Sequence, residues 1–236
     1  MHYVSYSDVV IEVTRRCNMT CEHCLRGAAQ NLNQTKENID KFFQHTGDIS
    51  HITFTGGEPS LVPEVIDYTR ESAIKHGVEV GNFFIATNGK NITEAFVIAC
   101  LKWWSYCFEN EATSVELSQD DFHEDKTSLN YGLLEGLSFF RERRHLNSEY
   151  TLEQGRGKEF ATGRKVEKEY FEVYEEQNNC FRVGEGVVYL NCKGELIAGC
   201  DWSFRNQHRY KLCNVGELTL EHMEDFGADI EYLEAQ

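Results

Sequence analysis

Short runs of apolar residues alternate with longer amphipathic stretches along the first 140 residues. The apolar runs predict strands at 9–13, 52–54, 83–86 and 115–117. Between and after them, apolar residues recur with helical spacing and predict helices at 35–46, 60–76, 93–106 and 127–141. Strands that alternate with helices are typical of a parallel sheet or barrel covered by helices. The pattern therefore predicts an α/β fold.

The pattern changes after residue 141. Residues 141–168 are locally basic, with eight Lys and Arg against five Glu. From residue 187 the segment VVYLNCKGELIAGCD contains two apolar runs around a glycine turn, which predicts an antiparallel hairpin, and a last helix is predicted at 220–226. We therefore expect a core domain at 1–165 and a small C-terminal domain at 166–236.

The charge balance argues against several classes of partner. The 236-residue chain has a formal net charge of −16, so nucleic acids and anionic membranes would repel it. No apolar run reaches the roughly 18 residues that span a bilayer, and the first residues, MHYVSYSDVV, lack the pattern of a signal peptide. We expect a cytoplasmic protein with no membrane partner and no generic binding of nucleic acid.

Nine cysteines in such a chain favour metal binding or redox chemistry, because a reducing cytosol disfavours disulfides. Cys17, Cys21 and Cys24 form the spacing C-x3-C-x2-C directly after the first predicted strand. Three thiolates can hold a [4Fe–4S] cube and leave its fourth iron open to another ligand. A structural zinc site needs four ligands and would have to use His23, which lies between two of the cysteines.

The segment VTRRCNMTCEHC, followed after the second predicted strand by TGGEP, resembles the signature of the radical S-adenosylmethionine (SAM) superfamily. The resemblance implies a partial (β/α)6 TIM-like barrel in which Cys17, Cys21 and Cys24 hold a [4Fe–4S] cluster. It implies that SAM binds the open iron through its amino and carboxylate groups. It also places His23 near the adenine of SAM.

The same resemblance assigns further contacts with SAM to the ends of the predicted strands. Glycines in the TGGEP loop let backbone atoms approach a ligand closely, although such a loop alone is a common turn before a helix. The residues assigned are Gly56, Gly57 and Glu58 for the amino group, Asn88 of TNG at the end of strand three, Ser118 and Asp120 for the ribose, and Arg156 of GRG for the carboxylate, with His123 facing substrate. From the residues alone, TNG is equally explained as a tight turn and the acidic run at 109–125 as a solvated loop.

The last 60 residues resemble the small C-terminal extension called a twitch domain, a shorter relative of the SPASM domain. The resemblance implies a β-hairpin followed by a helix, and an auxiliary [4Fe–4S] cluster bound by Cys180, Cys192, Cys200 and Cys213. The turn at Gly194 would bring the two strands of the hairpin together. The spacing C-x13-G-x5-C is one residue longer than these domains often show, and the alternative is that the four thiols pack in a small β core.

The resemblance implies a radical SAM enzyme. An external one-electron reductant of flavodoxin or ferredoxin type would reduce the cluster, and SAM cleavage would give a 5′-deoxyadenosyl radical that abstracts hydrogen from substrate. The C-terminal resemblance favours modification of a peptide or protein, and a nucleoside or other small molecule is the alternative substrate. A non-enzymatic iron–sulfur carrier or binding protein is the other class, although a carrier has no use for the glycine loop. No catalytic residue of the chain itself is assigned.

Overall fold

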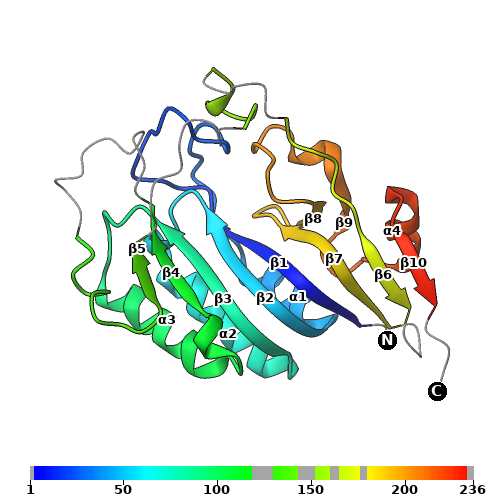
Figure 1. The fold of residues 1–236 in the computed structure, drawn as a ribbon, viewed down its shortest axis with the longest axis horizontal. Coiled ribbons are helices and arrows are strands. Elements are labelled where there is room, and N and C mark those ends of the chain that lie inside the picture. The colour runs from blue at the N-terminus through cyan, green and yellow to red at the C-terminus, as the bar shows by residue number, and fades with distance from the viewer. Residues whose placement is uncertain (1–2, 119–129, 143–151, 160–164, 176–179, 233–236) are drawn as a thin grey trace.

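The computed structural model describes residues 3–118, 130–142, 152–159, 165–175 and 180–232 (Figure 1). The helices are α1 (Lys36–Gln44), α2 (Pro63–His76), α3 (Glu94–Tyr106) and α4 (Leu220–Phe226). The strands are β1 (Val4–Thr14), β2 (Thr46–Gly56), β3 (Glu79–Thr87), β4 (Ser114–Leu117), β5 (Phe140–Glu142), β6 (Glu172–Glu175), β7 (Phe181–Leu190), β8 (Glu195–Ala198), β9 (Lys211–Asn214) and β10 (Asp229–Tyr232).

The strands form one open sheet in the order β10-β6-β7-β1-β2-β3-β4-β5, with β8 and β9 added beside β7 (Figure 1). Strands β1 to β5 pair in parallel in chain order. The path ends at β5 on one side and at β10 on the other, so the sheet does not close. The predicted α/β fold with a partial barrel is confirmed.

The helices α1, α2 and α3 lie together on one face of the sheet (Figure 1). Successive side chains of β1 point to opposite faces, so Val9 and Ile11 enter the main core under the helices while Val10 lies in a smaller cluster on the other face. Trp103 of α3 is fully buried in the main core, with its ring centroid 5.1 Å from that of Phe54. Helices on one face leave the opposite face of β1 to β4 available for a site.

Two caps explain where the helices begin and end. The hydroxyl of Thr35 accepts a hydrogen bond from the backbone N–H of Asn38 at the start of α1. Gly77 ends α2 with a φ of 70°, the left-handed conformation that glycine adopts easily, as its sequence position predicts. The helix predicted at 127–141 is wrong over its described part, because residues 130–139 form turns and β5 follows. Gly136 in this segment has a φ of 84°, which a helix does not allow.

The C-terminal part of the chain extends the same sheet. Strand β7 runs parallel to β1, with Val4 opposite Phe181 and Ile11 opposite Leu190. The predicted hairpin is confirmed, since β8 pairs antiparallel with β7, and α4 has the predicted bounds. The expected domains 1–165 and 166–236 thus share one sheet. None of the described helices has the length and apolar character needed to cross a membrane.

Candidate active site

The three clustered cysteines lie on the loop that connects β1 to α1. All three are half-buried. Two local backbone hydrogen bonds shape the loop. The N–H of Cys24 donates to the carbonyl of Cys21 at 3.3 Å, and the N–H of Gly27 donates to the carbonyl of Cys24 at 3.2 Å. Burial raises the pKa of Cys17, and the neighbouring carboxylate of Glu58 and thiol of Cys24 raise it further. The backbone of Arg16, directly before Cys17, bonds to Glu58, so Cys17 lies near the glycine loop.

The glycine loop packs directly against the backbone that leads into Cys17. The N–H of Gly57 donates to the carbonyl of Thr14, and the N–H of Glu58 donates to the carbonyl of Arg16, both at 2.8 Å. A β-carbon at Gly57 would lie 2.1 Å from the carbonyl oxygen of Arg16, and one at Gly56 would lie 1.9 Å from that of Thr14. The close approach that these glycines permit is made with the cysteine loop itself.

Glu58 holds three loops together. Its buried carboxylate accepts hydrogen bonds from the N–H of Ser60 at 3.0 Å, from the hydroxyl of Thr87 at 2.7 Å and from the N–H of Asn88 at 2.8 Å. The side-chain amide of Asn88 in turn donates to Asn18, between Cys17 and Met19, at 2.8 Å. These bonds connect the loops that follow β1, β2 and β3, so Glu58 fixes the shape of the site.

The other predicted site residues have mixed outcomes. Ser118 follows β4, where its N–H donates to the carbonyl of Thr87 at 2.8 Å, so it lies beside the TNG turn. His23 is half-buried within the cysteine loop. Asp120 and His123 lie outside the described residues.

Arg156 docks onto the cysteine loop from a distant part of the chain. Its Nε donates to the carbonyl of Cys21 at 2.8 Å, and its N–H donates to the carbonyl of Cys24 at 2.9 Å. A β-carbon at the preceding Gly155 would lie 2.3 Å from the carbonyl oxygen of Leu25. The GRG segment therefore belongs to the site, and the guanidinium lies beside the cysteines.

The donor set fits an iron–sulfur cluster. Such a cluster takes thiolates as its ligands, and three thiols lie here on one short loop. An arginine and a glycine-rich backbone lie next to them. Within the described ranges, no three His, Cys, Asp or Glu side chains gather as the ligands of one metal ion do. Each thiolate of a cubane binds a different iron, so the sulfur atoms do not converge on one point.

The four cysteines predicted to bind an auxiliary cluster all lie among the described residues, and this structure does not bring them together. Cys180 directly precedes the strand β7 and Cys192 follows it, so the length of the strand lies between them. Cys200 packs in the small cluster on the helix-free face, whereas Cys213 lies in the main core on the other face. Burial raises the pKa of both Cys200 and Cys213 to about 12. Both thiols pack among apolar side chains, and the auxiliary cluster stays a prediction.

A buried ion pair that was not predicted from the sequence lies directly before the cysteine loop. The Nε of Arg15 lies 2.5 Å from Oε1 of Glu12, and both side chains are almost fully buried. Glu12 also accepts hydrogen bonds from the hydroxyl of Tyr189 at 2.5 Å, from Gln207 at 3.0 Å and from the N–H of Cys192 at 3.1 Å. Burial alone would raise the pKa of Glu12. The charge of Arg15 and the hydrogen bonds from Arg15, Tyr189 and Gln207 hold this pKa below its usual value.

This ion pair joins the C-terminal segment to the cysteine loop. The Nη2 of Arg15 donates to Gln207 at 2.6 Å, across 192 positions of sequence. A glutamate among the apolar residues of the first predicted strand was the available signal, since a charge inside a buried strand needs a partner.

Replacing Gly57 by alanine is expected to remove most of the iron and most of the SAM binding. The new β-carbon would clash with the carbonyl of Arg16, which cannot move without moving Cys17. Iron per chain after anaerobic reconstitution and SAM affinity by equilibrium dialysis measure the effect. Gly132→Ala is the control, because its β-carbon would have no heavy atom within 4 Å. Wild-type iron and SAM affinity in Gly57→Ala would contradict this packing argument.

Comparisons with known proteins give one family and one fold. The model described as "Radical SAM superfamily" matches residues 11–151. No curated protein sequence matches the chain. The solved structure "Native anSMEcpe with bound AdoMet" matches with a TM-score of 0.56 at 14% identity, over 93% of this chain and 80% of that one. A histidine-tagged form of anSMEcpe with bound AdoMet gives 0.55 at 16% identity, over 92% and 80%. "Native anSMEcpe with bound AdoMet and Cp18Cys peptide" gives 0.52 at 14%, over 94% and 80%.

Proposed function

The chain belongs to the radical SAM superfamily of enzymes, and from this premise we propose that it cleaves SAM reductively at a [4Fe–4S] cluster held by Cys17, Cys21 and Cys24. The single observation that carries the proposal is the arrangement of the cysteine loop, with the glycine loop bonded to one end of it and Arg156 bonded to its middle. When bound, the cluster supplies the electron that cleaves SAM, and so the radical that takes hydrogen from substrate.

The residues around the loop would hold SAM in place. Among described residues, the carboxylate of Glu58 is already engaged by three donors, so we assign the SAM amino group to the backbone of Gly56 and Gly57. Arg156 bonds to the cysteine loop through Nε, which leaves its Nη groups for the SAM carboxylate. His23 would lie near the adenine.

The proposed ribose contacts follow β3 and β4. Asn88 and Ser118 stand at the ends of these two neighbouring strands, and Asp120 comes two residues later in the sequence. Carboxyl ends of parallel strands meet at one edge of a sheet, where ligands of such folds bind. The TNG turn is braced by Glu58, so its position is set by the same bonds that shape the cysteine loop.

We propose a peptide or protein as the substrate. The helix-free face of the sheet presents polar side chains from adjacent strands, with His51 contacting Asn82 and lying 3.2 Å from the hydroxyl of Thr53. Such a face can pair with the polar groups of a peptide. A structure of this fold holds a peptide together with AdoMet, which supports the same choice here. A nucleoside or another small molecule is the second candidate, favoured only by the same polar side chains.

Anaerobic incubation of the reconstituted protein with SAM and dithionite is expected to produce 5′-deoxyadenosine and methionine. Omitting dithionite should prevent product formation, because SAM is cleaved only after one electron is supplied. Liquid chromatography with mass detection measures both products. A reconstituted protein that holds iron and sulfide but releases no 5′-deoxyadenosine would refute the enzyme and support a non-enzymatic iron–sulfur protein.

A further inference from the structure

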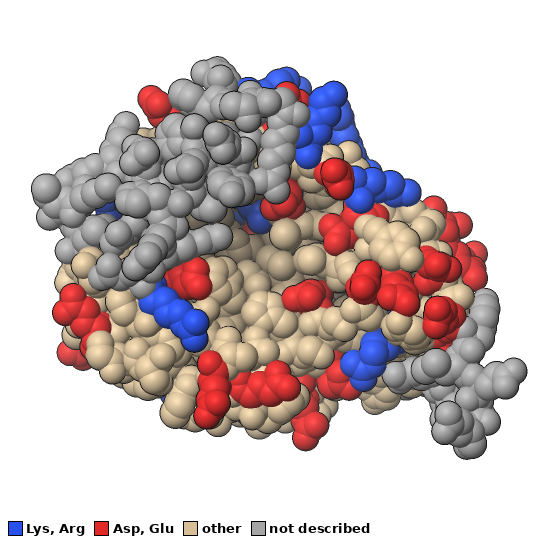
Figure 2. Space-filling model, in the orientation of Figure 1, with Lys and Arg blue, Asp and Glu red and all other residues tan. Residues whose placement is uncertain are grey.

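A small group of cations stands out on this acidic chain. The segment 202–212, WSFRNQHRYKL, contains three Lys and Arg and one His but no acid, in a chain of net charge −16. Its exposed residues Arg205, His208 and Arg209, with Lys193 on the turn between β7 and β8, form what we call the basic island. Figure 2 shows Lys and Arg gathered on the upper rim of the molecule, whereas Asp and Glu cover its right and lower sides.

The basic island borders a recess of about 420 Å³. Lys193, Arg205 and His208 line it, and the buried guanidinium of Arg15 lies at its base. Glu195 also lines the recess, and its carboxylate is 3.3 Å from the ammonium of Lys211. The exposed side chains of Lys193 and Arg205 at this recess suit the carboxylates of an acidic partner.

The segment that carries the island packs against both ends of the cysteine loop. Arg15, two residues before Cys17, has its guanidinium 4.5 Å from the centre of the Phe204 ring. Arg26, two residues after Cys24, donates to the carbonyl of Trp202 at 2.8 Å and accepts from the N–H of Phe204 at 3.1 Å. A protein seated on the island would therefore be separated from the cysteine loop by little more than one layer of side chains.

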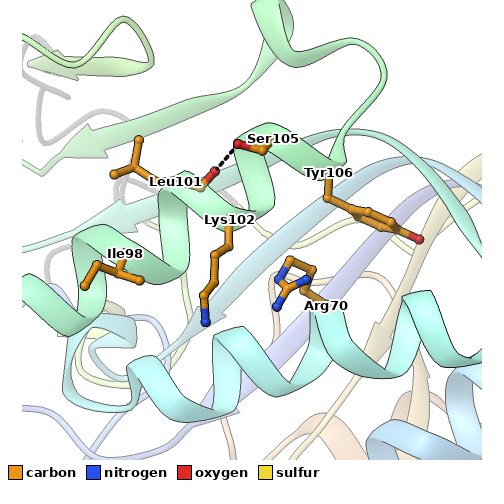
Figure 3. Close-up of a pocket in the computed structure, with 6 residues that line it drawn as sticks. All are labelled: Arg70, Ile98, Leu101, Lys102, Ser105 and Tyr106. Carbon is orange, nitrogen blue, oxygen red and sulfur yellow. Dashed lines mark hydrogen bonds between the residues drawn. The ribbon is translucent and has the colours of Figure 1, made fainter.

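A second groove with cations offers an instructive contrast. It lies between α2 and α3 and is lined by Arg70, Ile98, Leu101, Lys102, Ser105 and Tyr106 (Figure 3). Both of its cations bind the one carboxylate of Asp67, Arg70 at 3.0 Å and Lys102 at closer range, so half of their charge is balanced. This groove is on the helix layer, whereas the cysteine loop follows the end of β1. The second groove therefore has cations but lacks the proximity to the cysteine loop.

We propose that the basic island is the docking surface for an acidic one-electron carrier protein that reduces the site at the cysteine loop. The proposal rests on the proposed function, which requires one electron for each SAM cleaved. The carrier is oxidised by one electron and the cluster is reduced by one. Opposite charges on the two proteins steer their encounter and orient the carrier, because the rest of this acidic chain repels it.

A direct binding experiment tests the island without relying on activity. Oxidised flavodoxin, an acidic carrier, is titrated against the wild-type protein and against Arg205→Glu/Arg209→Glu. We expect the variant to bind about tenfold or more weakly, and wild-type binding to weaken as salt is added. The control Lys75→Glu/Lys102→Glu reverses two exposed cations on α2 and α3 and should bind like wild type. Equal binding by all three proteins would overturn the proposal.

Reduction measured with two donors separates the island from the active site. SAM cleavage without substrate is compared with reduced flavodoxin and with dithionite, so that docking of a substrate plays no part. The island variant should be slow with flavodoxin and normal with dithionite. Slow cleavage with both donors would mean that the charges act on the active site, and would overturn docking. Failure of wild-type protein to cleave SAM with dithionite would instead refute the proposed function, whereas the binding result would still stand.

Discussion

Replacing Cys17, Cys21 and Cys24 together by alanine is expected to leave the protein with almost no iron and no SAM cleavage. These thiols are the three that lie on one loop beside the glycine loop and Arg156. The C-terminal cysteines should not substitute for them, because these cysteines lie apart. Strand β7 lies between Cys180 and Cys192, and Cys200 and Cys213 pack on opposite faces of the sheet. Iron and sulfide per chain after anaerobic reconstitution, and 5′-deoxyadenosine formation, measure the two losses.

Cys180→Ala is the matched control, since Cys180 is also half-buried but lies at the far end of β7. It should keep wild-type iron and activity. About four irons and four sulfides in the triple variant would show that the C-terminal cysteines do bind a second cubane, contrary to their positions. Wild-type SAM cleavage by the triple variant would show that the cysteine loop is not the cluster site.

Replacing Arg15 by methionine is expected to lower the free energy of unfolding by about 3–5 kcal/mol. Methionine fills a similar volume but leaves the carboxylate of Glu12 buried without its cation. Breaking a buried ion pair by removing one partner costs this much because the remaining charge has lost both its partner and its water. Urea unfolding followed by tryptophan fluorescence measures the difference.

Arg16→Met provides the control at the neighbouring position, where the side chain is exposed. It should change the free energy of unfolding by less than about 0.5 kcal/mol, as exposed substitutions do. The double variant Glu12→Gln/Arg15→Met should be more stable than Arg15→Met alone, because the buried charge is removed as well. A loss below about 1 kcal/mol in Arg15→Met would mean that water or another cation compensates Glu12.

The elements that follow a local period could be predicted from the sequence. Apolar runs placed β1 to β4, helical spacing placed α1 to α3, and the spacing of Cys17, Cys21 and Cys24 pointed to the site. Each of these signals lies within a few residues of the feature that it predicts. The helix expected at 127–141 also rested on local apolar spacing. The glycines in this segment, which disfavour a helix, were given too little weight.

The arrangement of the C-terminal segment could not be predicted in this way. The hairpin was expected to start at 187, which left Cys180 in a connecting bridge, free to approach Cys192. Strand β7 starts at Phe181 instead, because residues 181–190 find a partner in β1. The choice of that partner depends on residues some 177 positions away, so no local pattern reveals it.

The pairing of β7 with β1 also sets an order of events during synthesis. One edge of β1 pairs with β2 early, but its other edge stays unpaired until residue 181 and those after it leave the ribosome. Contacts between such distant segments make folding slow, and an unpaired strand edge invites aggregation in the meantime. The Glu12–Arg15 pair acquires Tyr189 and Gln207 in the same late step, so the cysteine loop reaches its final shape only on a nearly complete chain. We therefore expect iron–sulfur assembly to follow translation, and a chain cut short before β7 to aggregate rather than to accept a cluster.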